Sequence, residues 1–224
     1  MPLTIRRLLA LGPCVAGCVN SGDVATGDLT LAAHADQDDS GTTMVWAPLY
    51  AAGRSVDIEE GDEQCIVVGG ADVACILKGT TAFLQAELLP GSDTSAIGVE
   101  LRRTEQVSAL GTLIAVPDPF TLDDPGAAAE GSDLLLSWSP TASEPMRVSV
   151  DGACVEPAEE EIDDSGSWTL PGDVLTRTDD GSTDCTVTVT VERVRSGAVD
   201  DALDPASTAE GIQERSLRVT LAGA

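Results

Sequence analysis

The chain has 224 residues, and 12 lysine and arginine residues stand against 38 aspartate and glutamate residues, for a formal net charge of −26. This charge excludes a nucleic-acid binder, because phosphate contacts need lysine and arginine. Apolar runs are too short for a transmembrane helix. Hydrophobic residues make up 42% of the chain and aromatic residues only 3%, so a folded core must be aliphatic.

Residues 1–17 predict a secretory signal peptide. Met1–Arg7 carries two arginines and no acid, and Leu8–Gly17 is apolar apart from a break at Gly12 and Pro13. A charged start followed by a short apolar run is typical of such a peptide, and the run is too short to span a bilayer as a helix.

The signal peptide ends in the sequence Val15-Ala16-Gly17-Cys18. This run resembles the lipobox of bacterial lipoprotein precursors, a small apolar triplet that ends in glycine or alanine before an obligatory cysteine. The resemblance covers residues 1–18 and implies that Cys18 is the lipid-attachment site and the N-terminus of the mature protein. Val19 after the cysteine implies delivery to the outer membrane. The alternative is an ordinary signal peptide in which Cys18 is a coincidence.

Six cysteines occur in the chain: Cys14, Cys18, Cys65, Cys75, Cys154 and Cys185. The last four lie beyond the lipobox and allow three disulfide connectivities. Cys65 and Cys75 flank a Gly-Gly turn, and Cys154 and Cys185 both fall in the second half of the chain. We therefore predict one bridge per domain, Cys65–Cys75 and Cys154–Cys185. A zinc or redox site is disfavoured, because neither pair has C-x-x-C spacing and His34 is the single histidine.

Residues 18–27 predict a polar tether, and residues 28–116 predict a first β domain. Short apolar or alternating runs, separated by turn residues at the spacing of a sandwich, predict its strands. These runs are Asp28–Ala33, Thr43–Leu49, Ser55–Ile58, Gln64–Val68, Val73–Leu77, Ala82–Leu88, Ile97–Arg103 and Val107–Val116.

The proline-rich segment Pro117–Pro125 predicts a boundary, since prolines are not tolerated in a central strand. Residues 117–224 then predict a second β domain, in which Thr186–Arg193 alternates valine with polar residues as a half-buried strand does. We expect residues 197–214 to be a long connection. The predicted strands are Asp133–Ser139, Met146–Asp151, Ser167–Leu170, Cys185–Val194 and Arg215–Leu221, with helical turns at Pro171–Leu175 and Pro205–Gln213.

Leu134–Pro140, Gly166–Pro171 and the Thr-Val strand resemble the immunoglobulin-like and fibronectin-type β-sandwiches of bacterial surface proteins. The pattern implies an all-β fold with two antiparallel β-sandwich (immunoglobulin-like) domains after a cleaved signal peptide. Trp138 precedes Cys154 instead of lying between the two cysteines, so the resemblance extends to the architecture and not to a named family. We interpret Trp138 and Trp168 as core anchors, because large aromatic side chains bury much area.

Motifs for catalysis or for phosphate binding do not occur in the sequence, so we predict no catalytic residue, no cofactor and no metal site. Asp36, Asp38 and Asp39 match the first half of a calcium-binding loop, but Ala47 stands where the loop needs a bidentate glutamate. We interpret this cluster and the other acid runs, including Glu159–Asp164, as solvated loops.

The sequence therefore predicts a cell-envelope lipoprotein with a non-catalytic binding or structural role. Its expected partners are the membrane, through lipidated Cys18, and an unknown protein or glycan ligand, with no nucleic acid. Two alternatives remain open: a glycan or peptidoglycan hydrolase that works through two carboxylates, and a calcium-dependent adhesion module.

Overall fold

The computed structural model describes residues 18–77, 83–178 and 185–222, so the predicted signal peptide at 1–17 lies outside the described residues. The described residues form strands and three short 3-10 helices, without an α-helix. The prediction of an all-β fold is confirmed for these residues. Over the same ranges, no helix is long and apolar enough to cross a membrane.

The chain divides into two compact units. Unit 1 contains the residues up to Val116 together with Arg195–Ile212, and unit 2 contains Pro117–Val194 together with Gln213–Ala224. The segment Arg195–Ile212, which the sequence placed in the second domain, is thus part of unit 1.

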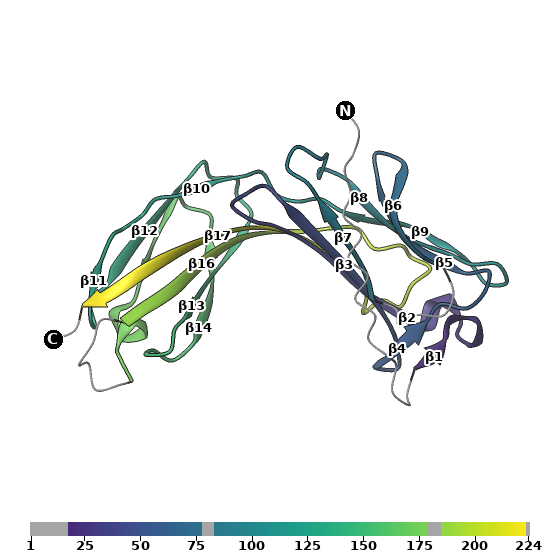
Figure 1. Ribbon diagram of the computed structural model, residues 1–224, viewed down its shortest axis with the longest axis horizontal. Coiled ribbons are helices and arrows are strands. Elements are labelled where there is room, and N and C mark those ends of the chain that lie inside the picture. The colour runs from purple at the N-terminus through teal and green to yellow at the C-terminus, as the bar shows by residue number, and fades with distance from the viewer. Residues whose placement is uncertain (1–17, 78–82, 179–184, 223–224) are drawn as a thin grey trace. The chain divides into compact units, whose positions relative to one another are not determined.

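Unit 1 is a sandwich of two sheets around an aliphatic core (Figure 1). One sheet contains β1, β4, β3 and β2 in this order, with β7 paired to β3, and the other has the order β6-β5-β8-β9. Alternate residues of β2, from Leu29 to Ala35, are buried, as a strand with one face on the core requires. The strands are β1 (Val19–Asn20), β2 (Leu29–Gln37), β3 (Thr43–Ala51), β4 (Arg54–Asp57), β5 (Glu63–Val68), β6 (Ala71–Leu77), β7 (Phe83–Leu88), β8 (Ile97–Arg102) and β9 (Ala109–Ile114).

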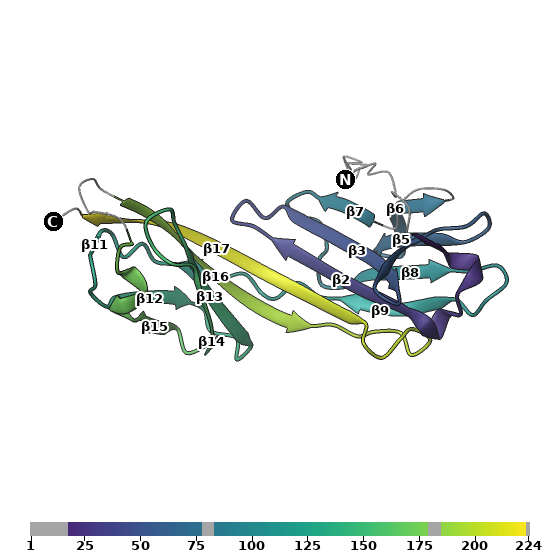
Figure 2. The ribbon, with the colours of Figure 1, turned by 90° about the horizontal axis from the view of Figure 1, so that it is seen from below.

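Unit 2 has its own core between two further layers (Figure 2). One layer has the order β10-β12-β15, and the other contains β16, β13 and β14 side by side. Val187, Val189 and Val191 of β16 are fully buried, which confirms the alternation predicted for this strand. The elements are β10 (Thr121–Leu122), β11 (Ala128–Ala129), β12 (Leu134–Ser139), β13 (Pro145–Asp151), β14 (Ala158–Asp163), β15 (Ser167–Leu170), η3 (Gly172–Leu175), β16 (Cys185–Ser196) and β17 (Thr208–Ala222).

Most of the strand pairs whose register the structure describes are antiparallel, as predicted, and two short ones among them are parallel: β1 with β4, and β11 with β17. The predicted connection at 197–214 ends earlier than expected, because β17 already begins at Thr208, where a helical turn was predicted. Its early residues alternate in burial through Ala209, Gly211 and Gln213. Because these inward positions hold small or polar residues, the sequence of this part of β17 lacks the alternation of apolar and polar residues by which a strand is recognised.

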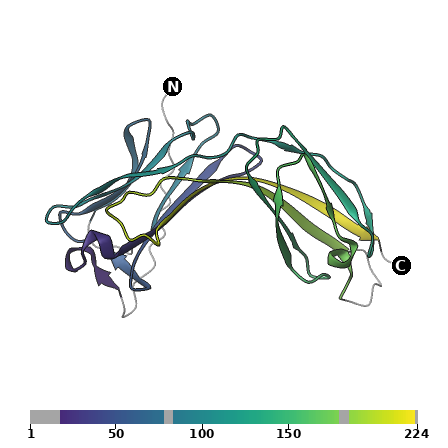
Figure 3. The same ribbon diagram turned by 180° about the vertical axis from the view of Figure 1, so that it is seen from behind.

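The predicted tether at 18–27 is instead folded onto unit 1 (Figure 3, purple). β1 is followed by the 3-10 helices η1 (Ser21–Asp23) and η2 (Thr26–Asp28). The fully buried Arg103 side chain forms an ion pair with Asp62 at 3.2 Å. It also donates hydrogen bonds to the carbonyl of Val24 and the hydroxyl of Thr26, both at 2.9 Å. The polar segment 18–27 is therefore ordered by hydrogen bonds to residues far along the chain, which its own sequence does not predict.

The segment Arg195–Ile212, which returns to unit 1 from unit 2 and is called the returning segment below, covers the edge strand β9. Asp200 accepts hydrogen bonds from the backbone N–H groups of Leu110 and Gly111 in edge strand β9, at 2.8 and 2.6 Å, and from that of Ala202 at 2.8 Å. The bond from Ala202, with those from Gly111 and Leu110, lowers the pKa of Asp200 below its ordinary 3.8, although partial burial acts in the opposite direction. The charged form of Asp200 is thus the form that stabilises the fold.

Asp200→Asn should lower the free energy of unfolding at pH 7 by about 1–2 kcal/mol, because hydrogen bonds to a charged acceptor are lost. Since the folded pKa is depressed, the stabilising contribution is present above pH 3.8 and disappears as the pH falls through the folded value. Urea unfolding at pH 7 and near the acid limit measures this. The exposed neighbour Asp201→Asn is the control, and a difference between Asp200→Asn and wild type that does not shrink in acid would contradict the assignment.

Candidate functional site

A groove of about 950 Å³ lies in unit 2. Residues from the start of β13, from β14 and from the start of β15 line it. Its apolar side contains buried Met146 together with Ile162 and Trp168, which pack against the core of unit 2. Five acids complete the lining: Glu144, Glu160, Glu161, Asp163 and Asp164.

The groove exists because the chain changes sheets between β14 and β15. β14 is the last strand of its sheet and pairs with β13, whereas β15 pairs with β12 of the other sheet. Residues 164–166 make the crossing, so the interior of the sandwich is open along this side. Trp168, predicted as a core anchor, packs against the core from β15 and at the same time lines the groove; Trp138 is buried as predicted.

Strand β14 places a glutamate on the core side of the sheet. Glu160 lies opposite Val148, and Ile162 lies opposite Met146, in the antiparallel register of β13 and β14. Residues directly opposite each other share one side of a sheet, and both Val148 and Met146 are buried. Glu160 therefore lies on the face of β14 that is turned toward the core. It is nevertheless exposed, because β14 is the edge strand.

The prediction that Glu159–Asp164 is a solvated loop is wrong, because residues 158–163 form β14. The three consecutive glutamates of this segment indicated a solvated loop. An edge strand can nevertheless have this composition, because it needs few apolar residues. Ala158 and Ile162, spaced evenly around Glu160, are the partly buried positions of β14. That spacing is the signal in the sequence that could have identified the strand.

Asp164 closes the inner end of the groove as part of a buried network. It accepts hydrogen bonds from the indole N–H of Trp138 at 2.7 Å and from the backbone N–H of Ala142 at 2.6 Å. Its partner in an ion pair is Arg193 at 2.9 Å, and both side chains are fully buried. Burial raises the pKa of Asp164, but the hydrogen bonds from Trp138 and Ala142 and the charge of Arg193 outweigh it and lower the pKa. Asp164 is thus a structural anion.

The pKa is held below its ordinary range at Asp72, Asp93, Asp164 and Asp200, and of these Asp164 lines the groove. A glycosidase of the predicted alternative type needs a general acid whose pKa is raised. Asp164, held as an anion by its partners, does not have the raised pKa that such an acid needs. Carboxylates around an apolar floor offer negative charge to a ligand instead, and a positively charged ligand is the one they favour.

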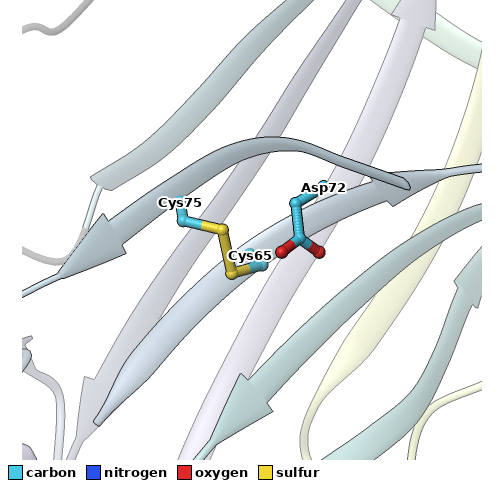
Figure 4. Close-up of side chains that lie close together, drawn as sticks. All are labelled: Cys65, Asp72 and Cys75. Carbon is cyan, nitrogen blue, oxygen red and sulfur yellow. A yellow bond between two sulfur atoms is a disulfide. The ribbon is translucent and has the colours of Figure 1, made fainter. Parts of the chain in front are cut away.

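Both predicted disulfides are present, Cys65–Cys75 and Cys154–Cys185. Cys65 and Cys75 face each other across β5 and β6, and Asp72 lies beside them (Figure 4). These three residues are the one group of three possible metal ligands among the described residues. The sulfur atoms are bonded to each other and offer no thiolate, so the group is not a metal centre in the oxidised protein.

Asp72 has a different partner, the guanidinium of Arg102 on β8. Two hydrogen bonds, at 2.7 and 2.8 Å, join the two side chains. These hydrogen bonds lower the pKa of Asp72. The arrangement is an ion pair on the surface of the sheet next to the disulfide.

The calcium-loop residues take roles in a turn. Asp38 accepts hydrogen bonds from the backbone N–H groups of Ser40 and Thr42, at 2.9 and 3.1 Å, and so closes the turn between β2 and β3. Gly41 supplies the positive φ of 79° that this turn needs. Asp36 belongs to β2 itself. In the part of the chain that the structure describes, Asp36, Asp38 and Asp39 are not brought together as ligands.

Comparison with known proteins gives only distant structural likenesses. No family model matches the chain, and no curated protein matches it. Among solved structures, the FN1–FN3 domains of chicken CNTN1 match with 10% identity and a TM-score of 0.27, over 92% of this chain and 68% of that one. The adhesin InvE of Yersinia pseudotuberculosis matches with 13% identity and a TM-score of 0.24, over 87% and 58%.

The ligand-binding domain of human OSCAR matches with 10% identity and a TM-score of 0.27, over 84% of this chain and 97% of that chain. TM-scores this low do not establish a shared fold with any of the three proteins.

Proposed function

We propose that this protein is a non-catalytic binding protein of the bacterial cell envelope, and that the groove of unit 2 is its ligand site. The observation that carries the proposal is the acid-lined groove with Met146, Ile162 and Trp168 on its apolar side. Apolar contact area with a few convergent polar groups is the usual composition of a binding site. The lowered pKa of Asp164 in the groove suits a structural anion and not a general acid.

The envelope location is supported by two independent features of the chain. The run Val15–Cys18 resembles a lipobox, and two disulfides of the folded units fit an oxidising compartment. The strongly acidic chain is repelled by anionic lipid headgroups, so membrane attachment depends on acyl chains, each buried methylene of which contributes about 0.8 kcal/mol.

The fold limits the spacer between the predicted anchor and unit 1. Because residues from Val19 onward are folded onto unit 1, an anchor at Cys18 has almost no flexible spacer.

Cys18→Ala should abolish the incorporation of a palmitate analogue and release the protein from the membrane fraction. Cys14→Ala, four positions earlier in the predicted signal peptide, is the matched control and should retain both. Metabolic labelling followed by flotation of membranes measures the two properties. Persistent labelling of the Cys18→Ala protein would refute lipid attachment at this residue.

A further inference from the structure

We propose that the groove of unit 2 takes an extended basic peptide segment of a partner protein, which pairs with the free edge of β14 as a further strand. This inference rests on the proposed function of the groove as a ligand site. It adds the chemical class of the ligand and the geometry of its recognition.

The first step is the edge itself. Among the described strands, β14 pairs with β13 and with no strand on its other side. An edge strand presents a row of backbone N–H and C=O groups, and a peptide can pair with that row as an additional strand. β14 has six residues, which offer an edge of about 20 Å for pairing.

The second step is the charge next to that edge. Glu160 lies on the core side of β14, and Glu161 and Asp163 follow on the opposite side. Side chains of an added strand meet these residues as cross-strand neighbours, where opposite charges attract and like charges repel. Basic side chains on either side of the peptide are therefore complementary to this edge.

The third step is the apolar floor. Ile162 shares the core side of β14 with Glu160, and Trp168 approaches from β15, so the groove continues the sandwich interior beside the edge. A peptide residue that faces the core side next to Ile162 can bury an aliphatic side chain there. The Trp168 ring can also receive a guanidinium or ammonium group on its face.

The acidic edge argues against two other occupants. A second copy of this chain would bring β14 next to β14 and set glutamates against glutamates, which is unfavourable. An apolar strand would bury the charge of Glu160, and an inward charge on an edge strand is a known barrier to such pairing. The groove lining contains no basic residue that a basic ligand would have to displace. Arg147 on β13 is already paired with Glu159 and Glu192, at 3.2 and 3.1 Å.

The test uses an octapeptide of alternating lysine and valine as the probe, with the full-length protein. Titration calorimetry at low salt should detect binding that weakens at high salt, since the contact is electrostatic and exposed. Glu160→Gln/Glu161→Gln should weaken the binding by about tenfold or more. The control Glu105→Gln/Glu156→Gln removes the same charge from exposed positions outside the groove and should leave it unchanged.

Two further arms separate this inference from the function it rests on. A peptide with the same charge but with prolines at alternate valines cannot form the ladder hydrogen bonds and should bind much more weakly. Equal binding of both peptides would overturn strand addition while leaving the groove as a site for cationic ligands. Undetectable binding of the lysine-valine peptide, or equal weakening by the control variant, would overturn the inference as well. Labelling at Cys18 is unaffected by any of these outcomes and continues to test the envelope location.

Discussion

Arg193→Met should lower the free energy of unfolding of unit 2 by about 3–5 kcal/mol, because it leaves the buried carboxylate of Asp164 without its cation. Neither side chain is accessible to solvent, and the ion pair spans 2.9 Å. A buried charge that loses its partner cannot recover the hydration that it gave up on folding. The substitution keeps most of the volume, so the loss is electrostatic more than it is a matter of packing.

Arg193 also bonds to the segments that flank the paired strands β10 and β12. Its guanidinium donates hydrogen bonds to the carbonyl of Asp118 at 2.9 Å and to that of Pro140 at 2.6 Å. It stacks 4.8 Å from the centre of the Phe120 ring, a cation–π contact. Loss of Arg193 therefore leaves two carbonyl groups without their donor and loosens the segment that begins unit 2.

The matched control is Arg218→Met, an exposed arginine on β17 of the same unit. It should change the stability by less than about 0.5 kcal/mol. Urea unfolding followed by tryptophan fluorescence measures this, with Trp138 and Trp168 reporting on unit 2 and Trp46 on unit 1. The double variant Arg193→Met/Asp164→Leu should be less destabilised than the sum of its two single variants, since it removes both charges together. Strict additivity would show that the two residues do not act as a pair.

The position of Arg193 could be predicted in part from the sequence. The alternation of Val187, Val189 and Val191 continues to residue 193, so a period of two places this arginine on the buried side of β16. An arginine at an inward position predicts a buried acidic partner, because an unpaired buried charge is strongly unfavourable. The partner itself, Asp164, could not be predicted. It lies where the chain passes from β14 to β15 of the other sheet, and nothing in the sequence distinguishes its acid run from the other acid runs.

The candidate groove was less accessible to sequence reasoning than the core. The core strands show clear aliphatic alternation, and the disulfide pairs followed from their positions in the chain. The groove instead depends on tertiary convergence of residues 143–146 with 160–168. β14 was missed because one half-buried edge strand can consist mainly of glutamate without a large cost.

The N-terminal segment was misjudged for a related reason. Its buried residues Ser21 and Thr26 are polar, so local hydrophobicity reports an unstructured tether. Ser21 donates a hydrogen bond to Asp62 at 2.8 Å, and Thr26 accepts one from Arg103 at 2.9 Å. Burial of polar residues is affordable when such partners exist, and they lie far along the chain.

Gly211→Ala should destabilise unit 1 by about 2–4 kcal/mol, because the added methyl group has no room. A Cβ at this position would overlap the carbonyl oxygen of Ala115 and press on the Cα of Val116. Both obstacles are backbone atoms, which cannot move aside as the end of a flexible side chain can. The neighbouring Gly197 meets the carbonyl of Leu113 in the same way, so the returning segment packs closely along the end of β9.

Glycine at 211 is thus required by close approach of two backbones, and its left-handed freedom is not used. In the sequence this glycine favours a loop, which is how residues 197–214 were interpreted. Gly27→Ala is the control, because the nearest atom to its added Cβ is the carbonyl oxygen of Ala202 at an ordinary 3.8 Å. Thermal and urea unfolding should place the Gly27→Ala protein near wild type or slightly above it. If Gly211→Ala were equally neutral, the backbone of β17 could not lie as close to Ala115 as it does, and the assignment of Arg195–Ile212 to unit 1 would lose its main packing argument.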